Sequence, residues 1–70
     1  MQPEKAVIGK KVCFDDPRAH IRDPRHYPEQ NTVGIIREVE QNGVKVQWLR
    51  GTVGYHGLCF AKFHQIKAVM

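Results

Sequence analysis

The chain has 70 residues and a formal net charge of +4, from 11 Lys and Arg against 7 Asp and Glu. This length allows one domain, residues 1–70, whose small core leaves little room for a closed catalytic cleft in a single copy. No apolar run approaches the roughly 20 residues that span a membrane, and residues 1–11 hold no apolar stretch of signal-peptide length, so a cytoplasmic protein is predicted.

The first expected element is a strand over Ile8–Phe14, with apolar side chains at its ends and two lysines between them. Residues 15–31 follow as a long loop. Pro17, Pro24 and Pro28 are expected to exclude a regular helix or a central strand from this loop. Loops of this length in a compact domain are functional or disordered, so we expect residues 15–31 to contribute to function.

Residues 32–49 predict a β-hairpin. A β-branched run over 33–39 precedes the turn, and after it Val44, Val46 and Trp48 alternate with side chains that point the other way. These three residues are therefore predicted to face the core. Gln41-Asn42-Gly43 supplies the turn, because Asn and Gly tolerate the positive φ that the favoured two-residue hairpin turns require.

Three shorter elements complete the prediction. Arg50-Gly51 makes a turn before a fourth strand at Thr52–Tyr55. Leu58–Phe63 is too short for a regular helix and favours one 3₁₀ turn. A fifth strand is expected over Gln65–Val69. Five short strands in so short a chain predict an all-β domain.

The order of these elements resembles a small SH3-like barrel. Val44, Val46, Trp48 and Gly51 match the spacing V-x-V-x-W-x-x-G, with Thr-Val-Gly upstream at 32–34 and a tyrosine downstream. The chain is thereby similar to SH3-like domains of the Mib/Herc2 type and, more loosely, to Tudor and KOW modules. The resemblance covers about residues 8–69. It implies a single five-stranded barrel with a long loop after strand 1 and a 3₁₀ turn before the last strand.

The excess of positive over negative charge lies entirely in the second half of the chain. Residues 1–40 hold seven basic and seven acidic side chains, whereas residues 41–70 hold four basic side chains and no carboxylate. Such asymmetry favours a polyanionic partner, and the alternative is an ordinary solvated face. A nucleic-acid-binding module is therefore one hypothesis, and its cations are Lys45, Arg50, Lys62 and Lys67.

A protein-binding adaptor or inhibitor is the first hypothesis, with its surface on loop 15–31 and the face around Trp48 to His56. The loop sums to −1, and pairing of its arginines with its aspartates would make it rigid. An oligomeric enzyme with a site on a symmetry axis is a third hypothesis, and assembly of identical copies would help so small a core. The residues expected to contact a partner are Arg18, Arg22, Arg25, Tyr27, Lys45, Arg50, Tyr55, His56 and Lys62.

The aromatic side chains are divided between core and surface. Trp48, Phe60 and Phe63 are expected inside, because a domain of this size needs its largest apolar groups buried. Tyr27 and Tyr55 are expected at the surface, where they could contact a partner.

The sequence predicts no catalytic centre and no cofactor. Serine is absent, and nothing in the sequence sets a base beside Cys13 or Cys59, which are expected to be small buried side chains without a disulfide. His56, Cys59 and His64 have the spacing H-x₂-C-x₄-H, with Cys13 as a fourth candidate ligand. Structural zinc sites use closer ligand pairs, so no metal is expected.

Overall fold

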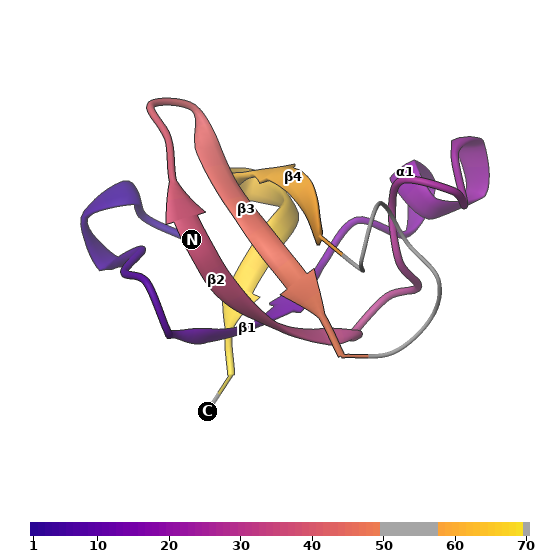
Figure 1. Cartoon of the computed structure of the whole chain (residues 1–70). Helices are drawn as coiled ribbons and strands as arrows, with labels where there is room; N and C mark the ends of the chain where they lie inside the picture. The colour runs from indigo at the N-terminus through magenta and orange to yellow at the C-terminus, as the bar shows by residue number, and fades with distance from the viewer. Residues whose placement is uncertain (50–57, 70) are drawn as a thin grey trace.

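The computed structural model describes residues 1–49 and 58–69. Five strands form one antiparallel sheet in the order β4-β3-β2-β1-β5 (Figure 1). The all-β class is thus confirmed, and among the described strands the two outermost, β4 and β5, do not pair with each other, so the sheet is not closed. No helix in these two ranges is long and apolar enough to cross a membrane. The elements in chain order are η1 Pro3–Lys5, β1 Lys11–Phe14, α1 Pro17–Arg22, β2 Val33–Val39, β3 Gly43–Trp48, β4 Leu58–Lys62, η2 Phe63–Gln65 and β5 Ile66–Ala68.

The predicted hairpin is formed by β2 and β3, but its turn differs from the prediction. Gln41, Asn42 and Gly43 all lack a positive φ. The turn closes with a hydrogen bond of 2.8 Å from the Glu40 amide to the Gly43 carbonyl. Glycine is needed at 43 for space, because a Cβ there would meet the carbonyl oxygen of Ala61 on β4. The close packing of β3 against β4 therefore explains why position 43 is a glycine.

Helix α1 contradicts the prediction that prolines keep regular helix out of loop 15–31. Pro17 occupies the first turn of the helix, where a missing N–H costs no hydrogen bond. Asp16 caps this end, since its Oδ1 accepts a hydrogen bond of 3.2 Å from the Ala19 amide. Ala19 is buried and fastens the helix to the core.

The C-terminal elements are shifted relative to the prediction. Leu58–Lys62 forms strand β4 and not a 3₁₀ turn, because it pairs along its whole length with β3. The 3₁₀ turn η2 follows directly and precedes the last strand, as predicted. The first strand starts only at Lys11, because Gly9, with φ +93, lies in a turn before it. The predicted strand Thr52–Tyr55 lies outside the described residues.

The core lies on one face of the sheet and includes the three hairpin residues predicted there. Trp48 is 4% exposed, and its ring meets the Phe14 ring edge-on at a centroid separation of 5.6 Å. The Tyr27 ring stacks on the Phe14 ring at a centroid separation of 5.9 Å and is half-buried, so Tyr27 lies only partly at the surface expected for it. Phe60 is 38% exposed, which corrects the expectation that it lies inside, whereas Phe63 is half-buried and packs against the core, in part as expected.

Candidate functional site

Loop 15–31 is fastened to the rest of the domain through its carboxylates. Asp16 Oδ2 accepts a hydrogen bond of 3.0 Å from Nε2 of Gln65. Gln65 is itself buried, and its Oε1 accepts a hydrogen bond of 3.0 Å from the Lys62 amide. This contact joins the start of α1 to η2, which is 49 residues away in sequence.

The same contact makes stability depend on pH. The hydrogen bond from the Gln65 side chain is the main cause that holds the pKa of the Asp16 carboxyl below its usual value. A lowered carboxyl pKa contributes stability that is fully present above the unfolded-state pKa, about 3.9, and is lost as the pH falls through the folded-state pKa. Thermal melts should therefore show Asp16→Asn below wild type at neutral pH, with the difference shrinking below about pH 4. A difference that stays constant down to strongly acidic pH would contradict this role for Asp16.

Two further carboxylates of the loop also have partners within the domain. Asp15 Oδ1 accepts a hydrogen bond of 2.6 Å from Gln30 Nε2 and lies 4.0 Å from Lys67 Nζ. Asp23 Oδ2 lies 2.8 Å from His26 Nδ1. The expected pairing of arginine with aspartate inside the loop is not found among the described residues. Asp16 and Asp15 instead connect the loop to η2 and β5.

The three arginines of the loop point to solvent. Arg18, Arg22 and Arg25 are exposed and form no ion pair with any described residue. Residues 50–57, which are not described, contain no carboxylate that could neutralise them. Asp15, Asp16 and Asp23 thus have partners within the domain, whereas the three arginines extend to solvent, with Arg22 near enough to Asp16 to help lower the pKa of its carboxyl.

An exposed aliphatic side chain lies among these arginines. Ile21 is 78% exposed, the largest value among the exposed apolar side chains of the described residues. Ala19 faces the core, and His20 Nδ1 donates to the Tyr27 carbonyl at 2.8 Å, so the helical repeat places Arg18, Ile21 and Arg22 on the outward side. Arg25 lies in the turn that follows. We call these four residues, Arg18, Ile21, Arg22 and Arg25, the arginine surface.

The three described cations of the second half, Lys45, Lys62 and Lys67, do not all lie on one surface. Lys45 Nζ lies 3.3 Å from Glu38 Oε2. Lys67 lies on β5, the edge strand at the other end of the sheet, and its Nζ is near the carboxylate of Asp15. Lys45 and Lys62 share the outward face of β3 and β4 with Phe60, which pairs with Lys45 across the strands. Arg50, Tyr55 and His56 were also predicted to contact a partner, and they lie outside the described residues.

The cysteines are free and half-buried. Trp48 Nε1 donates a hydrogen bond of 3.2 Å to Cys59 Sγ, and burial raises the pKa of the Cys59 thiol. A raised pKa keeps the thiol protonated at neutral pH, where it is a weak nucleophile. Within residues 1–49 and 58–69, no three His, Cys, Asp or Glu side chains gather in a way that could hold a metal.

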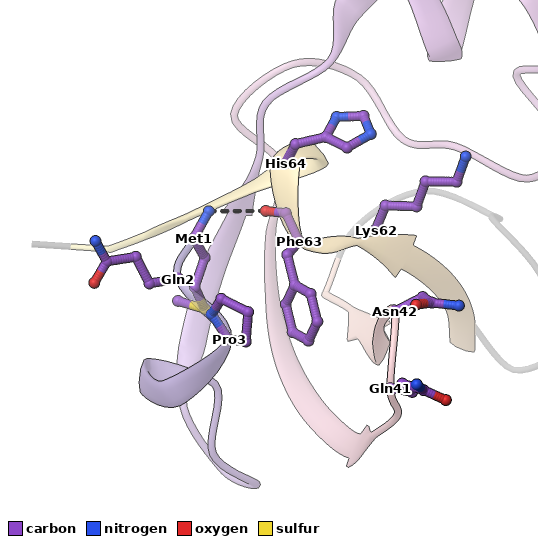
Figure 2. A pocket seen from close by; sticks show the side chains of 8 residues that line it. All are labelled: Met1, Gln2, Pro3, Gln41, Asn42, Lys62, Phe63 and His64. Carbon is purple, nitrogen blue, oxygen red and sulfur yellow. Dashed lines mark hydrogen bonds between the residues drawn. The ribbon is translucent and has the colours of Figure 1, made fainter.

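A groove that the sequence did not predict lies on another part of the surface. Three segments that are distant in sequence border it, which is why no local pattern reveals it. Figure 2 shows the Phe63 ring between Pro3 on one side and the tip of the β2–β3 hairpin on the other. The lining residues are Met1, Gln2, Pro3, Gln41, Asn42, Lys62, Phe63 and His64.

Comparisons with known proteins leave the function to be argued from these surfaces. No protein-family model, curated protein or solved structure matches the chain. The similarity to SH3-like domains therefore rests on the spacing of the hairpin valines, Trp48 and Gly51 alone. It stays a prediction.

Proposed function

We propose that the chain is a non-enzymatic SH3-like binding module that holds an acidic protein partner on the arginine surface. The observation that carries this proposal is the uneven pairing of charge in loop 15–31. Three of its carboxylates have partners within the domain, whereas its arginines form no ion pair with any described residue. Unpaired arginines around an exposed aliphatic side chain match the composition of protein interfaces, where arginine is enriched.

The strand order supports the SH3-like part of the proposal. A tight hairpin forms the middle of the sheet, a long loop follows the first strand, and a 3₁₀ turn precedes the last. In such a domain the loop is presented by a rigid sheet, and binding residues are disproportionately found on loops of this kind. Tyr27 supports the same view, because its stacking on Phe14 ties the loop to the core.

A protein partner is favoured over nucleic acid for three reasons. Single-stranded nucleic acid is held by bases stacked on aromatic side chains, and the aromatic side chain of this loop is already stacked within the domain. Of the four cations in residues 41–70, Lys45 and Lys67 have carboxylates nearby, which reduces their attraction for phosphate. Ile21 is better matched to an apolar patch on a protein than to a phosphate backbone.

Charge reversal on the arginine surface tests the proposal. Arg18→Glu with Arg22→Glu should weaken partner binding by about tenfold or more, because arginines within an interface are frequent hot spots. Lys5→Glu with Lys11→Glu is the matched control, since it changes the net charge equally at two exposed lysines elsewhere. The measurement is capture of partners from extracts of the native host, followed by titration of the captured protein. The lysine variant should melt close to wild type, because exposed substitutions change stability by only about 0.5 kcal/mol. The arginine variant should melt slightly lower, because the charge of Arg22 helps to lower the pKa of the Asp16 carboxyl.

Two results would contradict the proposal. Equal loss of binding in the arginine variant and its lysine control would mean that net charge alone attracts the partner. A gel shift of DNA or RNA that falls steeply with salt and is lost with Arg18→Glu and Arg22→Glu would assign the arginine surface to nucleic acid.

A further inference from the structure

The groove of Figure 2 has the size of a ligand site and is open to solvent. Its volume is about 620 Å³, within the range of 300–1,000 Å³ that is usual for ligand sites. The N-terminal turn, the β2–β3 turn and the β4–η2 junction form its borders. An open groove between three segments suits an extended ligand better than an enclosed small molecule.

The apolar part of the groove is held in a defined position. The Phe63 carbonyl accepts hydrogen bonds from the Ile66 amide and, at 2.8 Å, from the Met1 amino group. The ring of Phe63, a half-buried residue, packs against the core. Because two hydrogen bonds hold the Phe63 carbonyl and the ring packs against the core, the exposed part of Phe63 offers a preformed apolar contact for one side chain of a ligand.

The rim of the groove is polar and carries no negative charge. Gln2, Gln41 and Asn42 contribute amide side chains that make no hydrogen bond to the described part of the chain. An amide offers both donors and an acceptor, and these match the N–H and C=O groups of an extended peptide. Lys62 adds a cation, and none of the eight lining residues is a carboxylate.

We propose that this groove is a second binding site, which takes an extended peptide segment with an apolar side chain followed by a carboxylate. The apolar side chain covers Phe63, the carboxylate meets Lys62, and the amides of the rim bind the peptide backbone. Charge complementarity favours this occupant, because the rim has a cation without a neighbouring carboxylate among its lining residues. The site is separate from the arginine surface, since α1 and the N-terminal turn lie on opposite sides of Figure 1.

Titration of ¹⁵N-labelled protein with short peptides tests the site. The probe is acetyl-Gly-Leu-Glu-Gly-amide, and its two controls replace Glu by Gln or Leu by Ala. The Leu-Glu peptide should bind with a millimolar dissociation constant and shift the backbone signals of Phe63 and the side-chain amide signals of Gln2, Gln41 and Asn42. Both control peptides should bind more weakly.

Two lysine variants separate the site from general charge attraction. Lys62→Gln should weaken the Leu-Glu peptide by about two- to fivefold, the effect of one exposed ion pair, and leave the Leu-Gln peptide unchanged. Lys45→Gln is the matched control, because Lys45 lies on the neighbouring strand and does not line the groove. It should leave both peptides unchanged.

Several outcomes would overturn the groove as a peptide site. Among them are equal binding of all three peptides, no shift at millimolar concentration, and shifts centred on α1. The Arg18→Glu, Arg22→Glu variant should bind the Leu-Glu peptide as wild type does. If this variant loses the protein partner but still binds the Leu-Glu peptide, both proposals are supported. Because the two sites are tested by different ligands, either proposal can fail without the other.

Discussion

Trp48→Ala is expected to lower the free energy of unfolding by about 3–5 kcal/mol. Trp48 is 4% exposed, lies edge-on against Phe14, and donates its indole N–H to Cys59. Removal of the indole leaves a cavity in the core and takes away the partner of a half-buried thiol. A single small core rarely supplies more than about 3–5 kcal/mol, so the variant should be largely unfolded at room temperature.

Thermal melts followed by circular dichroism measure this loss. Leu49→Ala is the control, because Leu49 is adjacent in sequence but exposed, and its loss should cost only about 0.5 kcal/mol. Trp48→Phe should fall between the two, since it keeps an aromatic ring but loses the hydrogen bond to Cys59. A melting midpoint of Trp48→Ala equal to that of wild type would show that Trp48 does not support the core.

Gly34→Ala should also destabilise the domain, by about 1–3 kcal/mol. Gly34 lies on β2 directly opposite Trp48 on β3. A Cβ at this position would lie 2.5 Å from Val46 Cγ1, 2.6 Å from Trp48 Cε3 and 2.9 Å from the Gln47 carbonyl oxygen. The two side chains belong to the packed core and the carbonyl belongs to the backbone of a central strand. None of them can move aside without loss of other contacts.

Gly9→Ala is the informative comparison for Gly34→Ala. Nothing lies within 4 Å of a Cβ at Gly9, but its φ of +93 is unfavourable for any residue with a side chain. The Gly9 variant therefore measures backbone strain alone, expected to cost about 1 kcal/mol, whereas Gly34→Ala measures steric overlap. Equilibrium unfolding in urea gives both free energies. A Gly34→Ala protein as stable as wild type would mean that β2 and β3 can separate enough to admit a methyl group.

The hairpin could be predicted because its signal is local. Side chains alternate between the two faces of a strand, so the spacing of Val44, Val46 and Trp48 is enough to place them on one face. The same alternation could not by itself decide which side chains of β4 face the core. There the larger side chains, Leu58 and Phe60, face outward, and size therefore suggests the wrong face. Pairing with β3 decides the orientation, because the inward positions of β4 pack against Trp48 and Val44.

The two proposed binding surfaces depend on contacts between residues that are distant in sequence. The sequence by itself determined the all-β class, the hairpin core and the excess of positive charge. Only the tertiary structure decided which charges remain available to a partner. Gln65 donates a hydrogen bond to Asp16, 49 positions away in sequence, whereas the arginines of α1 are exposed to solvent. The groove likewise exists because the chain folds Met1 against Phe63, 62 residues away. The composition of a sequence gives its number of charges, and the alternation of side chains predicts which face of a strand is buried. Neither predicts the long-range hydrogen bonds that bring these segments together.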